Sequence, residues 1–366
     1  MKDIARRFEL KSDIASTERF GSGHINDTYL VNARQGPADV RFVLQRINSN
    51  VFKDPSALME NVGRVTRHIG ARRASGHAAL SLVPVPSGEN FHVDEAGHYW
   101  RMYHFLEGTR SYDTVPSAAH ARAAAAEFGA FLVALQDLPG QRLHETIPDF
   151  HNTPTRYSQL HEACTADACM RVQDCGAEIE QAMACEEAAG SLVALQRAGE
   201  IPERITHNDT KLNNVMFDVE SNAAVCVVDL DTVMPGLSLY DFGDMVRTST
   251  VPAVEDSREF AGVNVDMEYF EAISEGFIGA TSGLLNAAEM DNLAVAGKVI
   301  TIETGVRFLT DHLSGDTYFK VQYPGQNLDR CRMQFAVAAS IDEQLDVMKE
   351  IVARIGSRRH EQGITT

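Results

Sequence analysis

The hydrophobic period of this sequence changes about a third of the way along, and no other feature constrains the fold as much. Residues 1–106 contain short β-branched and aromatic runs separated by Gly, Pro, Asn and Asp, a pattern typical of strands joined by turns. Beyond residue 115 the apolar residues recur at helical spacing. We therefore predict an α+β, two-lobe architecture, with a small β-rich lobe over 1–106 and a larger, mainly helical lobe over 107–366.

Five runs in the first part are predicted strands, each bounded by turn-forming residues. They cover residues 21–30, 40–47, 80–85, 91–93 and 99–105. One helix interrupts them after Asp54-Pro55, a pair typical of a helix start. Its apolar stripe is formed by Leu58, Val62, Val65 and Ile69.

The second part is predicted to be mainly helical. Its first helix ends before Pro139-Gly140 and carries an apolar face formed by Phe128, Phe131, Leu132 and Leu135. Further helices are predicted near residues 155–198, 266–278, 287–312 and 328–355. The segment 201–245 differs, because a short apolar strand at 224–228 is embedded among Asp, Asn and Gly residues. We expect loops and a hairpin there.

The charge balance excludes some classes of partner. The chain has 33 Lys and Arg residues against 51 Asp and Glu residues, a formal net charge of −18 with His neutral. A field of this sign repels phosphate backbones and anionic lipid, which argues against a sequence-independent nucleic-acid binder and against a membrane-surface protein. No apolar run approaches the roughly 18 residues that a membrane span requires.

Cysteine usage and the N-terminal residues bear on the compartment. The six cysteines include no C-x-x-C pair, and the first residues show no continuous apolar stretch typical of a signal peptide. We therefore expect reduced thiols and a cytoplasmic protein. The sequence leaves a monomer and a homodimer both open.

The segment 205–217 carries the most specific chemistry. His207, Asp209 and Asn214 have the H-x-D-x-x-x-x-N spacing of a kinase catalytic loop. In such a loop a carboxylate accepts or orients the proton of the acceptor hydroxyl, and a neutral oxygen ligand reaches the metal that bridges the nucleotide phosphates. We predict Asp209 as the catalytic carboxylate and Asn214 as a metal ligand. Lys211 lies where a cation can meet the transferring phosphoryl group.

A second acidic motif follows the short apolar strand. Asp229 comes fifteen residues after Asn214, at the end of that strand. A carboxylate at a strand end is suited to Mg²⁺, a hard cation that takes oxygen ligands. The alternative is that these Asp residues cap turns. Either motif alone is weak evidence, whereas their ordered combination favours catalysis.

A Gly-rich turn near the N-terminus is a candidate phosphate-binding loop. Gly21, Ser22 and Gly23 lie between strand-like runs, and backbone N–H groups of such a hairpin can cover phosphates. A plain β-turn is the alternative. The dinucleotide-binding fingerprint lacks its third Gly and its helix, and no Walker P-loop is present.

Together these segments resemble the aminoglycoside phosphotransferase and choline kinase-like family. Its catalytic loop is H-x-D-x-x-x-x-N, and its metal-binding Asp lies in an apolar-Asp-apolar-acid motif, which Val228-Asp229-Leu230-Asp231 matches. Longer strings resemble family members that phosphorylate the C1 hydroxyl of N-acetylhexosamines. These strings cover residues 23–29, 42–48, 207–214, 228–236, 240–244 and 303–311.

The resemblance implies a protein-kinase-like fold, with ATP as the phosphoryl donor and Mg²⁺ as the cofactor. Within residues 103–108 it places the adenine-binding hinge, at Phe105, Leu106 and Glu107. It implies that the acceptor is the anomeric hydroxyl of N-acetylglucosamine or N-acetylgalactosamine, without choosing between them. It also implies substrate contacts by His24, Asp231 and Arg307. For Arg307 the alternative is an exposed helix residue paired with Glu303 or Asp311.

The phosphate-binding cation of the small lobe departs from the protein-kinase pattern. The predicted strand 40–47 carries Arg46 where a protein kinase has its phosphate-binding Lys. We favour a phosphate role for Arg46, but a one-residue slip would present Gln45 instead. Arg46 could also pair with Glu60 or be a solvated edge cation.

Asp241 and Asp244 are expected to brace the catalytic loop.

The sequence leaves two other functions open. The first is a kinase of the same fold that acts on an aminoglycoside, a choline-like amine or another sugar. The second is a pseudokinase that binds nucleotide without turnover, which the presence of Asp209, Asn214 and Asp229 argues against.

Overall fold

The computed structural model describes residues 1–21, 25–72, 79–251, 257–260 and 262–363. The chain forms two compact units. The first comprises Met1–Arg110, Asp137–Pro148 and Met216–Met234, and the second comprises Ser111–Gln136, Asp149–Val215 and Pro235–Thr366. The units thus interleave along the chain, and the functional lobe boundary predicted after residue 106 stays a prediction.

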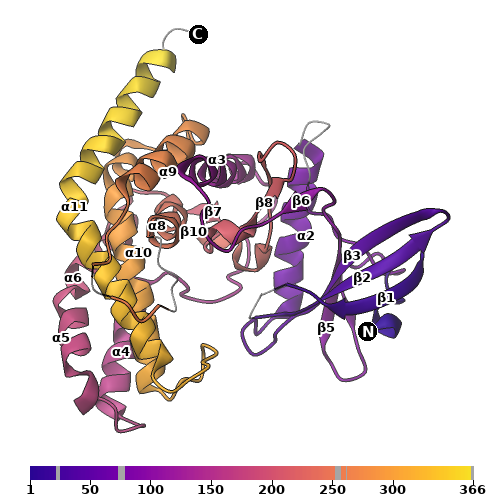
Figure 1. The fold of residues 1–366 in the computed structure, drawn as a ribbon, viewed down its shortest axis with the longest axis horizontal. Coiled ribbons are helices and arrows are strands. Elements are labelled where there is room, and N and C mark those ends of the chain that lie inside the picture. The colour runs from indigo at the N-terminus through magenta and orange to yellow at the C-terminus, as the bar shows by residue number, and fades with distance from the viewer. Residues whose placement is uncertain (22–24, 73–78, 252–256, 261, 364–366) are drawn as a thin grey trace. The chain divides into compact units, whose positions relative to one another are not determined.

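The first unit is built on a five-stranded antiparallel sheet with the order β1-β2-β3-β5-β4 (Figure 1). The short helix α1 (Lys2–Ala5) precedes it, and its strands are β1 (Asp13–Arg19), β2 (Asp27–Gln35), β3 (Ala38–Arg46), β4 (His92–Val93) and β5 (Tyr99–His104). Four of these overlap predicted strands, although β2 shares only residues 27–30 with the strand predicted over 21–30. β1 overlaps no predicted strand, because its residues are polar and mostly exposed and so form no apolar run.

One face of this sheet forms an apolar core. Val31, Leu44 and Met102 are fully buried on neighbouring strands, and Trp100 is 3% exposed beside them. The predicted strand at 80–85 is reduced to a single bridge between Leu82 and Tyr103. The prolines at 84 and 86 explain this, because they lack the N–H group that a longer ladder needs.

The remaining elements of the first unit are a helix and a small sheet. Helix α2 (Pro55–Arg72) begins as predicted, since the side chain of Asp54 accepts the N–H of Ala57 at 2.9 Å. Its predicted stripe is buried at Leu58, Val62 and Val65. The small sheet has the order β6-β8-β9, with β6 (Thr109–Arg110), β8 (Val215–Asp218) and β9 (Ala224–Val227).

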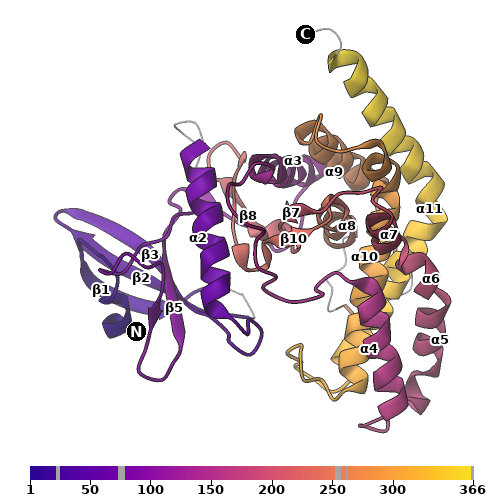
Figure 2. The same cartoon turned by 180° about the vertical axis from the view of Figure 1, so that it is seen from behind.

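The second unit is helical, as predicted. Its long helices pack in pairs, α10 along α11 and α3 against α9 (Figures 1 and 2). The helices are α3 (Ala118–Leu135), α4 (Thr153–Ala166), α5 (Gly176–Ala184), α6 (Glu186–Ala189), α7 (Ser191–Arg197), α8 (Ser238–Ser249), α9 (Met267–Ala280), α10 (Ala287–Leu313) and α11 (Gln326–Gly363). A two-stranded sheet joins β7 (Arg204–Thr206) and β10 (Met234–Gly236).

Two helical predictions need correction. The segment 155–198 is not one continuous stretch, because left-handed residues at Asp167 and Met170 end α4 and separate it from the short helices that follow. Helix α8 begins inside the segment 201–245, which was predicted to be loops and a hairpin, and extends beyond it. Its sequence contains Asp241, Gly243 and Asp244, which obscure a helical pattern.

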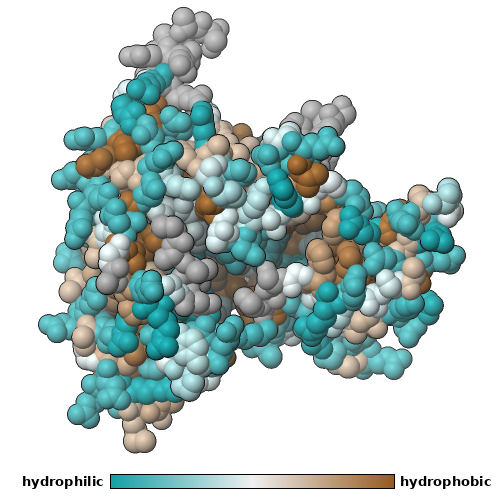
Figure 3. Space-filling view, in the orientation of Figure 1, coloured by the Kyte–Doolittle hydropathy of each residue, from teal (hydrophilic) through white to brown (hydrophobic). Residues whose placement is uncertain are grey.

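Helix α3 is long and apolar enough to cross a membrane by length and composition alone, and 44% of it is buried within the protein. Alanines supply much of its hydropathy, so it contains no long run of large apolar side chains. Its large residues, including Phe128, Phe131 and Leu132, lie in the core of the second unit. On the visible surface of both units, hydrophilic side chains predominate over scattered apolar patches (Figure 3).

The packing of α8 on α10 yields a stability prediction. A Cβ atom at Gly243 would lie 2.5 Å from the carbonyl oxygen of Ala296 and 2.8 Å from Cγ1 of Ile300. We therefore predict that Gly243→Ala lowers the free energy of unfolding by about 1–3 kcal/mol, measured by urea denaturation. Gly70→Ala is the matched control, because nothing lies within 4 Å of its Cβ position in α2. The control should be neutral or more stable by up to about 1 kcal/mol. Equal effects of both variants would contradict the account of this packing.

Candidate active site

The predicted catalytic loop follows strand β7 in the second unit. It leaves the strand through Asn208, which has a left-handed backbone with φ 65°, and ends in the short 3-10 helix η2 (Leu212–Asn214). Asn208 tolerates this conformation and fixes it locally, because its side-chain oxygen accepts the hydroxyl of Thr206 at 2.9 Å. The turn directs the chain into Asp209.

The loop brings Asp209, Lys211 and Asn214 together. The ammonium of Lys211 lies 3.1 Å from Oδ2 of Asp209, and Nδ2 of Asn214 donates to the same oxygen at 3.0 Å. The Asp209 side chain remains 26% exposed. Burial favours its protonated form, but the charge of Lys211 and these hydrogen bonds hold the pKa of Asp209 below its ordinary value. Asp209 is therefore an ionised carboxylate that keeps access to solvent.

His207 anchors the loop from inside. Its ring is fully buried and meets Phe128 and Phe131 of α3 edge-on, with centroid distances of 5.3 and 5.8 Å. Its Nδ1 accepts the backbone N–H of Asp209 at 3.3 Å. The His of the motif thus acts as a packing and hydrogen-bonding residue that orients Asp209.

Asp241 of α8 braces the loop, as predicted. Its carboxylate accepts the backbone N–H of His207 at 3.0 Å and that of Asn208 at 2.7 Å. Asp244 makes a different contact and pairs with Arg247 of the same helix at 2.9 Å. The close packing of α8 on α10 therefore fixes a carboxylate that in turn fixes the catalytic loop.

The acidic motif after β9 belongs to the first unit. Asp229 is exposed and has a left-handed backbone with φ 59°, which turns the chain directly after the strand. Asp231, two residues later, is 3% exposed; it pairs with the guanidinium of Arg101 and accepts Nδ2 of Asn26 at 2.7 Å. Both carboxylate oxygens of Asp231 thus already have protein partners. A bracing role fits these contacts, and the substrate role of Asp231 stays a prediction.

Arg101 is a residue that sequence reasoning missed. It is 1% exposed in β5, and the nearby charge of Asp231 keeps the pKa of Arg101 above its ordinary value despite the opposing effect of burial. The signal was available, since this Arg is a lone charge within the apolar run of a predicted strand. An uncompensated charge at such a position is costly, so it implies a buried acid as partner.

The register of β3 decides which face each of its polar residues occupies. Gln45 pairs with Thr28 and Arg101, and its side chain accepts Nε of Arg101 at 2.9 Å. Arg46 lies on the opposite face and pairs with Asp27. Gln45, not Arg46, therefore shares a face with the Arg101–Asp231 pair. The phosphate role of Arg46 stays a prediction.

The alternative partner of Arg46 can also be corrected. Glu60 lies 2.9 Å from Nε2 of His144 and 3.7 Å from Arg64, and the acid that pairs with Arg46 is Asp27. Strand pairing places Asp27 directly opposite Arg46, so these two side chains form the ion pair.

The candidate nucleotide-binding segments lie in the first unit. Gly21 has φ 80°, which suits a glycine turn, while Ser22, Gly23 and His24 lie outside the described residues. Their predicted roles stay predictions.

The predicted hinge follows β5. The N–H of Phe105 already donates to the carbonyl of Arg41 at 3.1 Å, and the carbonyl of Leu106 accepts the hydroxyl of Thr109 at 2.7 Å. Glu107 pairs with Arg41, whose guanidinium also lies over the Phe105 ring at 4.0 Å. These contacts hold the segment in place, and its contact with adenine stays a prediction.

Arg307 of α10 lies among aromatic rings in the second unit. Its guanidinium is 4.8 Å from the centroid of Phe150, 5.6 Å from Phe319 and 6.0 Å from Tyr318. Burial and the nearby charge of Arg307 lower the pKa of Arg156 to about 10.

The acids proposed as alternative partners of Arg307 have other contacts. The carboxylate of Glu303 is bound to His151, and that of Asp311 accepts backbone N–H groups of the loop that carries Tyr318 and Phe319. Arg307 is thus held against ring faces, in an environment that is both polar and aromatic.

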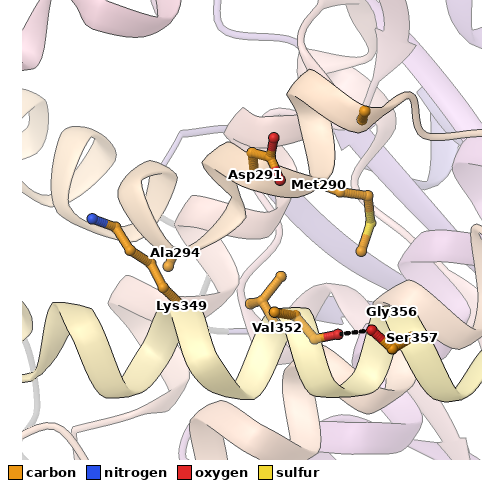
Figure 4. A pocket seen from close by; sticks show the side chains of 9 residues that line it. Met290, Asp291, Ala294, Lys349, Val352, Gly356 and Ser357 are labelled. Atoms are coloured by element: carbon orange, nitrogen blue, oxygen red, sulfur yellow. Dashed lines mark hydrogen bonds between the residues drawn. The ribbon is translucent and has the colours of Figure 1, made fainter.

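A separate cavity of about 750 Å³ lies between the start of α10 and the end of α11 (Figure 4). Met290, Asp291 and Ala294 line one side, and Lys349, Val352 and Gly356 line the other. Among the residues that the structure describes, no predicted catalytic or binding residue lines this cavity. The catalytic role of the loop after β7 stays a prediction.

The brace by Asp241 yields a prediction on pH. Burial, against the opposing effect of His207 and the backbone N–H groups, raises the pKa of Asp241 from 3.8 to about 6. Because the folded protein binds this proton more tightly than the unfolded chain, the contribution of Asp241 to stability declines as the pH rises between these values. The difference in unfolding free energy between the wild type and Asp241→Asn should therefore fall by about 1–2 kcal/mol between roughly pH 5 and pH 7.5. Urea denaturation of both proteins measures it, and a difference independent of pH would contradict the assignment.

Comparison with known proteins places this geometry in context. The profile of the phosphotransferase enzyme family matches residues 16–271. An aminoglycoside phosphotransferase from Alicyclobacillus acidocaldarius subsp. acidocaldarius DSM 446 has a similar structure, with a TM-score of 0.62 at 14% identity, over 97% of this chain and 96% of its own.

Two further solved structures share the fold. A microcompartment-associated aminopropanol kinase has a TM-score of 0.58 at 14% identity, over 95% of this chain and 97% of its own. A spectinomycin phosphotransferase, in complex with ADP and spectinomycin, has a TM-score of 0.54 at 11% identity, over 91% of this chain and 94% of its own. The predicted kinase-like fold class is confirmed, and the chain belongs to the phosphotransferase enzyme family.

Proposed function

We propose that this protein transfers the γ-phosphoryl group of ATP to the C1 hydroxyl of an N-acetylhexosamine, and is thus an N-acetylhexosamine 1-kinase. The observation that carries the phosphotransfer is the geometry of Asp209, an ionised and partly exposed carboxylate fixed by Lys211 and Asn214. A carboxylate in this setting can orient a hydroxyl and accept its proton.

ATP as the donor is supported by the family and by one neighbour. The spectinomycin phosphotransferase with the same fold was solved in complex with ADP. In this chain, Phe20 and Phe105 lie edge to face with centroids 5.9 Å apart, beside Gly21 and the predicted hinge. An aromatic surface of this kind suits a nucleotide base.

Mg²⁺ is proposed from the chemistry of the donor residues. The amide nitrogen of Asn214 donates to the backbone carbonyl and to the carboxylate of Asp209, so its amide oxygen suits a hard cation. Asp229 offers an exposed carboxylate. Among the described residues, no group of three or more His, Cys, Asp or Glu side chains is arranged to hold a metal. We propose Asn214 and Asp229 as ligands, with nucleotide phosphates and water completing the coordination; the metal would neutralise phosphate charge.

The acceptor is proposed from the resemblance of several strings to N-acetylhexosamine 1-kinases. Two of these strings contain Asp209 and Arg307. The aromatic environment of Arg307 supports a sugar, since ring faces pack against apolar sugar faces and a guanidinium donates to hydroxyl oxygens. A hemiacetal hydroxyl is more acidic than an ordinary alcohol. Asp209 therefore needs no raised pKa to act on it.

In the proposed reaction, the protein orients its substrates and moves one proton. Asp209 accepts the proton of the C1 hydroxyl as the sugar oxygen bonds to the γ-phosphorus and the bond to ADP breaks. Lys211, on the open side of the loop, neutralises charge on the transferring group. With a net charge of −18 and cysteines suited to a reducing compartment, we further propose a cytoplasmic location, as a monomer or homodimer.

We predict that Asp209→Asn lowers kcat by roughly 10²–10⁴-fold, because the amide cannot accept the hydroxyl proton. The KM for ATP should change little, and a coupled ADP-release assay measures both values. Asp174→Asn is the control, since Asp174 is an exposed Asp outside the catalytic loop in the same unit. Near-normal turnover of Asp209→Asn would overturn the catalytic assignment.

A second prediction concerns the acceptor. ADP release should be fastest with N-acetylglucosamine or N-acetylgalactosamine, compared with galactose, kanamycin and choline. Arg307→Gln should raise the KM for the preferred sugar roughly tenfold with the KM for ATP unchanged, because a hydrogen bond from a charged guanidinium contributes about 1.5 kcal/mol.

The outcome of that comparison separates the alternatives. A preference for kanamycin, choline or galactose would replace the sugar assignment by another acceptor within the same family. Binding of magnesium and ATP without turnover of any acceptor would identify a pseudokinase.

A further inference from the structure

We propose that His151 and Glu303 form a second brace of the catalytic loop, which acts on the carbonyl of Asn208 and so positions Asp209. The proposal rests on the proposed kinase function, because it assigns a role in orienting the catalytic carboxylate. His151 precedes α4, and Glu303 lies in the middle of α10. Neither residue belongs to the catalytic motif.

The contacts form a continuous chain within the second unit. Nε2 of His151 lies 3.1 Å from the carbonyl oxygen of Asn208, and its Nδ1 lies 2.7 Å from Oε1 of Glu303. The other carboxylate oxygen of Glu303 accepts the hydroxyl of Thr153 at 2.6 Å. The side chains of His151 and Glu303 are 5% and 0% exposed. Water therefore has little access to replace these bonds.

The partners of His151 define how its two ring nitrogens are used. A backbone carbonyl can only accept a hydrogen bond, so Nε2 must donate to Asn208. A carboxylate also accepts, so the ring bridges Glu303 and the loop carbonyl through its two nitrogens. Burial opposes the charged form of Glu303, but the contact with His151 holds the pKa of Glu303 below its ordinary value. The result is a buried pair with one N–H directed at the loop.

The two braces act on adjacent peptide groups. Asp241 accepts the N–H groups of His207 and Asn208, while His151 donates to the carbonyl of the peptide that joins Asn208 to Asp209. This peptide follows a left-handed residue, a conformation that is costly for a non-glycine and persists only when its surroundings fix it. Fixing donors and acceptors on both sides defines the peptide plane from which the Asp209 side chain projects.

The ring of His151 is itself held in orientation. It packs between Phe150 and Tyr240, with centroid distances of 4.6 and 5.0 Å. Phe150 is also the ring beneath Arg307. His151 therefore lies between the predicted sugar-contacting residue and the catalytic loop, and serves as a positioning residue.

Two substitutions of His151 separate its two hydrogen bonds. In His151→Gln the amide nitrogen can occupy the place of Nε2 and donate to Asn208. In His151→Asn the shorter amide can occupy only the place of Nδ1 and face Glu303. We expect backbone amide hydrogen exchange over residues 206–210, measured by mass spectrometry, to be roughly tenfold faster in His151→Asn than in His151→Gln.

The kcat and KM values of His151→Gln and His151→Asn are also measured, with ATP and the preferred acceptor as substrates. We expect His151→Asn to lower kcat roughly tenfold and His151→Gln to lose several-fold less, with the KM for ATP unchanged in both. His161→Asn is the control, because His161 is an exposed His that pairs with Glu186 on the surface. A loss of packing alone would lower kcat equally in both His151 variants and would overturn the proposal.

A second pair of substitutions, at Glu303, tests the brace if the His151 variants fail to fold. Glu303→Gln can donate to a neutral His151, whose Nε2–H then still reaches Asn208, whereas Glu303→Leu removes that support. Backbone amide hydrogen exchange over residues 206–210 should be slow in Glu303→Gln and fast in Glu303→Leu. Equal exchange rates in the two variants would overturn the proposed brace. The exchange measurement needs no substrate, so an enzyme inactive on every acceptor would refute the proposed function while leaving the brace to be decided.

Discussion

The carboxylate of Asp241 is the constraint on which the candidate site depends. It accepts two consecutive backbone N–H groups at the point where the chain leaves β7 and enters the catalytic loop. Those groups are buried, and without an acceptor each would cost on the order of 1–3 kcal/mol. The cost of burying Asp241 is visible in its raised pKa. The protein thus uses an unfavourable buried acid to fix the backbone beside the carboxylate of Asp209.

The first unit uses the same principle with a buried cation. Arg101 lies inside the sheet, where Gln45 and Asp231 satisfy its donors, and Asp231 in turn is held by Asn26. This network anchors the turn that presents Asp229. The two acids of this motif therefore differ. Asp231 is buried and fixes the turn, whereas Asp229 is exposed and is the one proposed to bind a metal.

The sequence predicts the parts of this structure that depend on local patterns. Strands β2, β3 and β5 and helices α2, α9, α10 and α11 follow from apolar periodicity, and Asp209, Lys211 and Asn214 follow from motif spacing. Helix α8 was missed because functional acids and a packing glycine replace part of its apolar pattern. The role of His151 could not be predicted, since its partners, Asn208 and Glu303, lie 57 and 152 residues away along the chain.

The same limit applies to Arg46 and Gln45. Their position in a strand was predicted, but the face that matters is set by the register with β5 and by the partner of Arg101, both of which are tertiary features. Motif spacing predicts which residues carry chemistry, and long-range contacts decide which neighbours support them.

Phosphorus NMR of the product formed from ATP and N-acetylglucosamine or N-acetylgalactosamine tests the central claim most directly. The proposed reaction predicts a sugar monophosphate whose phosphorus couples to the anomeric proton, formed together with ADP. A phosphorus resonance coupled to any other sugar proton, or the absence of a sugar phosphate with both sugars, would contradict it.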